Sequence, residues 1–248
     1  MINRLLAVTA ATLLGSTAAQ AAEPYNWTGF YAGFNAGYGF GGDGDIRTKG
    51  QAAPNIANIN GGARPGSVDL DRNGFVGGLQ AGYNYQVEQW VFGVEADISA
   101  ADLSDSSNVG TRALNTGAAL NNKFESQINY LGTLRGRVGY AVDRTLFYGT
   151  AGLAYGRTEQ SVDMFGANGA TQFSGSQSQF STGYIVGAGI EQAIDDNLTF
   201  RAEYMYYDLG TEKLDVAVIP GNGGAGTGYD SKFKNDGQLL RVGMNWKF

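Results

Sequence analysis

The chain has 248 residues, no Cys, no His and a formal net charge of −6. Without His or Cys there can be no Ser-His triad, no thiol nucleophile, no zinc site of the usual nitrogen and sulfur ligands and no His-ligated haem. We therefore expect no catalytic, cofactor-binding or metal-binding residues, and the acidic balance argues against nucleic acid as a partner. The 39 Gly are about twice the average share of roughly 7%, which favours strands and turns over helices.

The N-terminus has the pattern of a secretory signal peptide. A short positive segment ending at Arg4 precedes an apolar run over residues 5–15, and Ala19-Gln20-Ala21 forms an A-x-A cleavage site. We predict a signal peptide over residues 1–21 and a mature domain over residues 22–248, with a buried N-terminal helix as the alternative. Export of a chain without Cys fits a periplasmic or outer-membrane destination better than a disulfide-stapled secreted domain.

The mature chain contains segments in which apolar and polar residues alternate, which is the period of a β-strand. The spacers between them alternate long and short, which predicts one meander of antiparallel strands. The long spacers are rich in Gly, Asn, Ser and Asp, so we expect mobile exposed loops over residues 41–73, 102–126, 157–181 and 211–237. The eight alternating segments are residues 28–40, 74–86, 90–101, 127–140, 146–156, 182–192, 198–210 and 238–248.

The volume of the apolar faces decides whether they point into or out of a closed sheet. Each face carries four to six residues, many of them aromatic. An eight-stranded interior holds only about a dozen packed side chains. The apolar faces must therefore point outward to lipid, and the Gly-rich polar faces inward. We predict an all-β fold, an eight-stranded antiparallel up-and-down transmembrane β-barrel, and keep a two-sheet soluble sandwich as the alternative.

The order of residues along each outward face supports this orientation. Aromatic residues fall near both ends of the strands with small and aliphatic residues between, as expected for rings at the two membrane interfaces. Phe34, in the middle of its strand, is an exception. We place Trp27, Phe30, Trp90, Phe147 and Trp246 in the girdle near the short turns, and Tyr38, Phe75, Tyr130, Tyr155, Tyr184 and Tyr206 in the girdle near the long spacers.

Charged residues on the inward faces are nearly balanced in sign. Isolated charges in a narrow interior are costly, so we expect mutual pairing, with Glu95 or Asp97 opposite Arg135 or Arg137 on the neighbouring strand. A charged ion path and acid–base chemistry by Glu95 and Asp97 are alternatives. The predicted interior charge network contains Glu95, Asp97, Arg135, Arg137, Glu191, Arg201, Glu203 and Arg241.

Two short motifs match known binding loops but lack their context. Residues 69–74 match the first half of an EF-hand loop, yet the twelfth position is Gln80 and not Glu. Residues 221–226 satisfy G-x-G-x-x-G, yet they follow Pro220 and open no helix. Both segments are predicted to be polar loops.

Several strand sequences resemble the small alphaproteobacterial outer-membrane barrels, the porin-family surface antigens related to OmpA-type eight-stranded barrels. The resemblance covers all eight strands and not the long spacers, and it implies an outer-membrane location. The terminal Phe248 resembles the aromatic assembly signal read by the barrel-assembly machinery. The matching segments are WTGFYAG at 27–33, GGLQAGYN at 77–84, GVEAD at 93–97, RGRVGY at 135–140, AEYMY at 202–206 and RVGMNWKF at 241–248.

These observations favour a non-enzymatic, structural and surface-exposed component of the bacterial outer membrane. The partners we expect are outer-membrane lipid, lipopolysaccharide and, during insertion, the barrel-assembly machinery. A narrow passive pore is one alternative, and ligand binding or adhesion by the surface loops is another, although the sequence identifies no ligand. An outer-membrane protease, lipase or acyl-modifying enzyme is a third alternative, weakened by the absence of His.

Overall fold

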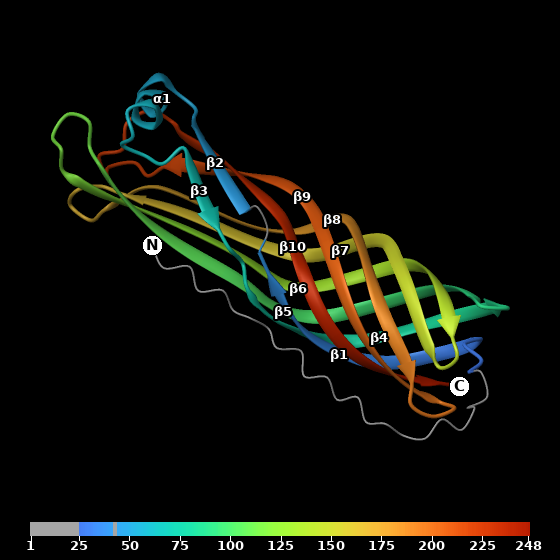
Figure 1. Cartoon of the computed structure of the whole chain (residues 1–248). Coiled ribbons are helices and arrows are strands. Elements are labelled where there is room, and N and C mark those ends of the chain that lie inside the picture. The colour runs from blue at the N-terminus through green and yellow to red at the C-terminus, as the bar shows by residue number, and fades with distance from the viewer. Residues whose placement is uncertain (1–24, 42–43) are drawn as a thin grey trace, which may run out of the picture.

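The computed structural model describes residues 25–41 and 44–248, and these residues form a long tube of antiparallel strands with one short helix (Figure 1). The predicted signal peptide, residues 1–21, and its cleavage site lie outside the described residues. The elements are β1 Gly29–Phe40, β2 Gly44–Gly50, α1 Ala53–Asn60, β3 Ser67–Leu70, β4 Gly74–Val87, β5 Trp90–Arg112, β6 Ala119–Val142, β7 Thr145–Phe165, β8 Thr171–Ala193, β9 Leu198–Val218 and β10 Gly228–Lys247.

Eight of these strands close on themselves. Each long strand pairs antiparallel with the next in the order β1-β4-β5-β6-β7-β8-β9-β10, and β10 pairs back with β1 from Tyr31–Lys247 to Phe40–Gln238. The closed cycle therefore has no free edge where it crosses the membrane, as a membrane-spanning sheet requires. The short turns lie at the end of the tube that also holds the C-terminus (Figure 1).

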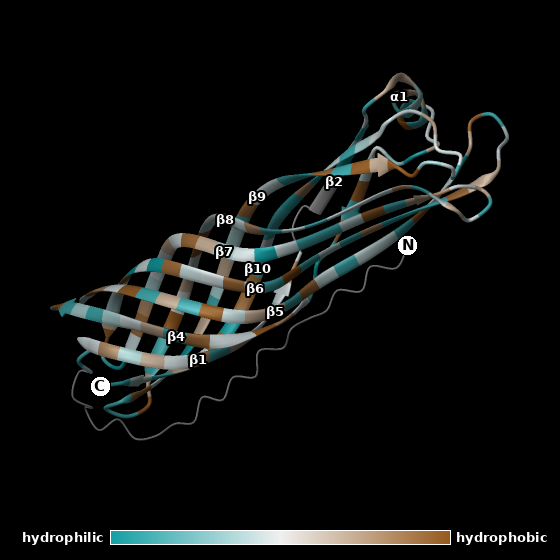
Figure 2. Ribbon diagram, turned by 180° about the vertical axis from the view of Figure 1, so that it is seen from behind, coloured by the Kyte–Doolittle hydropathy of each residue, from teal (hydrophilic) through white to brown (hydrophobic). Residues whose placement is uncertain are grey.

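The two faces of the barrel wall follow the predicted alternation. Along β5, Phe92, Val94 and Ile98 are exposed on the outside while Glu95 and Asp97 are buried inside. Figure 2 shows the same banding, with brown and teal residues alternating along each strand of the wide part of the tube. The predicted all-β eight-stranded barrel is confirmed. Within the described part of the chain, no helix has both the length and the apolar character needed to cross a membrane.

The predicted mobile loops are wrong for most of their length. The strand pairs continue far beyond the aromatic girdle near the long spacers. β5 pairs with β6 as far as Arg112–Ala119, and β7 pairs with β8 as far as Phe165–Thr171. The first long spacer holds β2, α1 and β3, of which β2 and β3 extend the sheet beside β10. The extension is ordered because it has its own core, formed by Ile46, Val68, Leu70, Phe124, Val162, Met164, Phe173, Leu214, Val216, Tyr229 and Phe233.

The strand pairing is irregular at the level where the lipid-facing apolar band ends and the extension begins. The register shifts between Ala100 and Leu103 on β5, and again beside Asn129 on β6. On β9, Gly210 takes a φ of 86°, a conformation that favours glycine, opposite the shift at Asn235 of β10. These bulges let the same strands change curvature between the wide barrel and the narrower extension (Figure 1).

Substitution of one outward residue by Arg tests the position of the lipid-facing band. Ala96 is exposed in the middle of the outward face of β5, and Asn108 is exposed on the same face of the same strand in the extension. We expect Ala96→Arg to lower the free energy of unfolding by about 2–4 kcal/mol in urea-titrated liposomes. Asn108→Arg should change it by less than about 0.5 kcal/mol. Equal losses of unfolding free energy in the two variants would show that the lipid-facing band does not lie where the structure indicates.

Candidate functional site

The barrel interior is divided into layers of alternating chemistry, which are visible along β9. Arg201 and Glu203 lie in a charged layer, Met205 and Leu209 in an apolar layer above it, and Glu212 in a polar layer above that. A third apolar cluster closes the short-turn end below the charged layer; it contains Tyr25, Trp27, Val91, Ala141, Leu146, Tyr148 and Ala193.

The position of Trp27 corrects one prediction. We expected its ring in the lipid-facing girdle near the short turns, but only 2% of Trp27 is exposed, and it packs edge-on against Tyr25 inside the barrel with ring centroids 4.7 Å apart. Trp27 precedes β1, so the alternation of that strand does not fix its direction. Its ring instead fills the short-turn end of the interior.

Three arginines and three carboxylates form the centre of the charged layer. Arg135 of β6 contacts Glu95 and lies 3.1 Å from Asp97 and 3.3 Å from Glu203. Arg201 of β9 lies 2.5 Å from Glu95 and 3.3 Å from Glu203. Arg241 of β10 lies 3.1 Å from Asp97 and 3.0 Å from Glu203. These six residues, called the central cluster below, have no net charge and link β5, β6, β9 and β10 across the interior.

Arg137 and Glu191 form a second pair beside the central cluster. Nη1 of Arg137 lies 2.9 Å from Oε2 of Glu191, and its Nε donates to Oδ1 of Asn84 at 2.9 Å. The guanidinium carbon also lies 5.0 Å from the ring centroids of both Tyr31 and Tyr148, which is cation–π geometry. The expected pairing of Glu95 and Asp97 with a neighbouring arginine therefore holds for Arg135, whereas Arg137 reaches across to β8.

All eight predicted network residues are brought into this layer, and each is between 1% and 5% exposed. Neutral side chains donate further hydrogen bonds to the carboxylates. Tyr31 donates to Glu95 at 2.7 Å and Tyr148 donates to Glu203 at 3.0 Å. Thr199 donates to Glu191 at 2.5 Å. The sequence did not predict Tyr148 as a member of this layer, because apolar and polar residues alternate least clearly in its strand. Tyr148 directly follows the outward-facing Phe147, and neighbouring residues of a strand face opposite sides, so Tyr148 faces the interior.

The pairing explains how so many charges can be buried. Removing a charged group from water costs several kcal/mol in a protein, and the cost is offset only when partners and hydrogen bonds replace the water. Here each carboxylate of the central cluster meets two or three guanidinium groups. These carboxylates are therefore held in ion pairs. In the described ranges 25–41 and 44–248, no group of three or more His, Asp or Glu residues is arranged to hold a metal ion.

A second buried arginine site closes the far end of the tube and was not predicted. Arg64, in the segment after α1, donates to Oδ1 of Asn122 at 2.7 Å, to the carbonyl of Phe165 at 3.0 Å and to Oε1 of Gln172 at 2.7 Å. Because burial removes water and these acceptors are neutral, the pKa of Arg64 is lowered from its usual value. Arg64 thus ties the first spacer to β6, β7 and β8 over the mouth of the tube.

The fold and its filled interior define an integral β-barrel of the outer-membrane type. The sequence matches the family described as "Outer membrane protein beta-barrel domain" over residues 8–248, so the chain belongs to this family. It is an outer-membrane protein.

Relatives of this chain are named as outer-membrane proteins. The chain is 33% identical to the 31 kDa outer-membrane immunogenic protein of Brucella melitensis biotype 1, over 91% of this chain and 85% of the relative. It is also 33% identical to the 22 kDa outer membrane protein of Rhizobium leguminosarum bv. viciae, over 74% of this chain and 72% of the relative. Its homologues thus include immunogenic outer-membrane proteins, consistent with the resemblance seen in the strand sequences.

Solved structures share the fold at low sequence identity. The outer membrane protein OprG from Pseudomonas aeruginosa superposes with a TM-score of 0.52 and 15% identity, covering 92% of this chain and 98% of that chain. The outer membrane protease OmpT from Escherichia coli superposes with a TM-score of 0.50 and 8% identity, covering 92% of this chain and 99% of that chain. These similarities show the architecture alone.

The pair Arg137–Glu191, which shares no ion pair with the central cluster, offers a direct test of charge compensation. We expect Arg137→Met or Glu191→Leu alone to lower the free energy of unfolding by about 3–5 kcal/mol, because each leaves a buried charge without its partner. The double variant should lose at least about 1.5 kcal/mol less than the sum of the two. The measurement is guanidinium-induced unfolding in detergent micelles.

The exposed pair Lys213–Asp230 is the matched control. Its Nζ and Oδ2 atoms are 2.9 Å apart, but the side chains are 57% and 28% exposed, so its coupling should be no more than about 1 kcal/mol. Strictly additive losses at Arg137 and Glu191 would contradict the view that the interior charges compensate one another.

Proposed function

We propose that this protein is a structural, surface-exposed component of the outer membrane whose interior is closed and which catalyses no reaction. The observation that carries the proposal is the electrically neutral central cluster, held between an apolar layer on each side. Each of its three guanidinium groups and three carboxylates forms ion pairs with the others across the interior. Such a layer leaves no charged side chain free to attract or relay ions.

The layer arrangement favours this reading over a narrow passive pore. A continuous water path along the axis would have to cross the apolar cluster around Trp27, the central cluster and then the apolar cluster around Leu131 and Met205. Eight-stranded barrels have interiors just wide enough to be filled by side chains, whereas aqueous porins use about 16–18 strands. The extension adds a further apolar core beyond the membrane.

The same pairing favours a role without catalysis. The OmpT structure shows that a protease can share this architecture. In the present chain Glu95 and Asp97, the carboxylate pair that could serve as acid and base, are each bound by two guanidinium groups. Both oxygens of each carboxylate are already bound by guanidinium groups, so neither carboxylate has an oxygen free to exchange a proton with a substrate.

Planar-bilayer recording tests the closed interior. We expect no steady ohmic conductance from the refolded monomeric barrel, because the layered side chains leave no continuous water column. A large porin inserted into the same bilayers serves as the positive control for the recording. A stable conductance from the barrel alone would overturn the proposal in favour of the pore.

Phe248 supports a role for the barrel-assembly machinery as a partner during insertion. The residue is 77% exposed at the end of β10, where its backbone N–H donates to the carbonyl of Phe30 at 2.9 Å. We expect deletion of Phe248 to reduce the amount of protein assembled in the envelope several-fold while refolding in detergent stays nearly unchanged. The readout is heat-modifiable mobility of membrane fractions on gels.

Phe147 provides the control for this deletion. It is another lipid-facing aromatic residue of the short-turn girdle, 52% exposed, but it lies on an internal strand. Phe147→Ala should not reduce assembly as deletion of Phe248 does. Equal effects of the two changes would show that Phe248 acts through packing and not as an assembly signal.

A further inference from the structure

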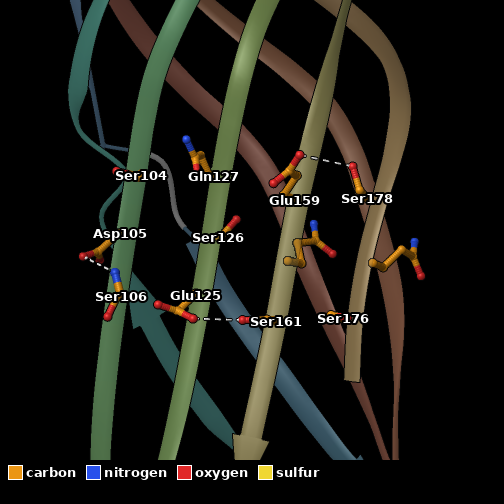
Figure 3. Close-up of a pocket in the computed structure, with 12 residues that line it drawn as sticks. Ser104, Asp105, Ser106, Glu125, Ser126, Gln127, Glu159, Ser161, Ser176 and Ser178 are labelled. Atoms are coloured by element: carbon orange, nitrogen blue, oxygen red, sulfur yellow. Dashed lines mark hydrogen bonds between the residues drawn. The ribbon is translucent and has the colours of Figure 1, made fainter. Parts of the chain in front are cut away.

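A polar hollow of about 640 Å³ lies on the outward face of the extension, across β5, β6, β7 and β8 (Figure 3). Two rows of side chains, adjacent in the strand register, form its outward surface; they are called the polar rows below. Ser126 and Gln160, between the rows, are buried toward the interior. The first row is Ser104, Gln127, Glu159 and Ser178, and the second is Ser106, Glu125, Ser161 and Ser176.

The depth of the hollow relative to the membrane follows from the same register. The cross-strand row on the membrane side of the first polar row contains Tyr130, Arg157 and Phe180. Phe180 is 61% exposed, and its ring centroid lies 5.9 Å from that of Tyr155. Exposed rings of this kind sit at the headgroup level of a bilayer. The polar rows therefore begin directly above the acyl region and face sideways into the headgroups of neighbouring lipids.

Arg157 sits at the boundary between the girdle and the hollow with part of its hydrogen-bonding capacity unused. Its Nε donates to Ser178 at 2.9 Å and lies 3.7 Å from Glu159. Its side chain is 55% exposed, and within the described residues neither terminal nitrogen makes a hydrogen bond. A guanidinium with free terminal N–H groups at headgroup depth matches a phosphate, which accepts two parallel hydrogen bonds from it.

The polar rows also retain free hydrogen-bonding groups. In the described part of the chain, the side chains of Gln127, Ser104 and Ser176 make no hydrogen bond, and Glu159 accepts only through Oε1, from Asn129 at 2.9 Å and from Ser178 at 3.4 Å. Carboxamide, hydroxyl and carboxylate groups together donate to and accept from a hydroxyl-rich ligand.

One edge of the hollow supplies backbone groups as well. β8 pairs with β9 at Ser174–Ala217 and again only from Tyr184–Asp208, so the stretch that carries Ser176 and Ser178 has no ladder on its β9 side. Backbone N–H and C=O groups on such an edge are available to another polar partner.

We propose that this hollow binds the phosphorylated sugar headgroup of an outer-leaflet glycolipid, with Arg157 contacting the phosphate and the polar rows contacting the sugar. The order of these groups along the membrane normal matches such a lipid. The acyl chains would lie at the level of the aromatic girdle, the phosphate at Arg157 and the sugar hydroxyls at the polar rows above. A protein partner fits less well, because the centre of a protein interface is apolar and aromatic. The inference depends on the outer-membrane location and not on a closed interior.

The experiment uses the full barrel in nanodiscs of phosphatidylcholine titrated with purified lipopolysaccharide lacking the O-chain, with bound lipid counted by native mass spectrometry. We expect one retained molecule per wild-type barrel and at least tenfold weaker retention by the triple variant Gln127→Ala, Arg157→Gln and Ser178→Ala. The control variant Lys213→Gln with Asp230→Asn, outside the hollow on β9 and β10, should retain lipid like the wild type. Unchanged urea midpoints establish that the variants fold.

Three results would overturn the proposal. Equal retention by the triple variant and the control variant would place the lipid elsewhere. Equal binding of phosphatidylglycerol, which carries phosphate without sugar, would remove the role of the polar rows. Equal affinity for the soluble core saccharide released from the lipid would assign the hollow to a soluble ligand.

Discussion

The interior of the barrel depends on one electrostatic constraint: charged side chains that face inward must balance one another, because a filled barrel of this size leaves little water to solvate them. Arg135, Arg201 and Arg241 balance Glu95, Asp97 and Glu203. Each of these six residues forms ion pairs with two or three of the others. Removal of one member therefore disturbs several ion pairs at once. The cluster also connects strands on opposite sides of the barrel, which fixes the shape of the cross-section.

The layers on either side follow from this constraint. Buried ion pairs are stronger when water is kept away from them, and the apolar clusters around Trp27 and Met205 provide that exclusion at the two ends of the charged layer. Nη1 of Arg135 lies 2.9 Å from Sδ of Met205, so the charged and apolar layers are in direct contact. The outer surface is arranged independently, since each residue there faces lipid, headgroups or water according to its height.

The period of two in the sequence predicted the membrane-crossing part of the eight barrel strands, their outward faces and the eight charged residues of the interior network. It predicted that Glu95 and Asp97 pair with an arginine on the neighbouring strand, which holds for Arg135, but it did not predict the partners across the interior. Arg137 meets Glu191, which is 54 residues away and on β8, because the curvature of the closed barrel brings side chains together across the interior and not only between neighbouring strands. The sequence predicts loops in the long spacers because polar residues occupy both faces there. Glu159 faces out and Gln160 faces in, so the alternation of hydropathy is weak even though the strand continues.

Hydrogen exchange at the arginine Nε–H groups, followed by nuclear magnetic resonance of the barrel in nanodiscs, tests the closed, charge-compensated interior most directly. Arg157, half-exposed on the outer surface, is the internal reference. The account predicts that the Nε–H groups of Arg135, Arg201 and Arg241 exchange at least about 100-fold more slowly than that of Arg157, because they are buried between apolar layers that exclude water. Exchange of the interior arginines at the rate of Arg157 would reveal water throughout the barrel and contradict the account.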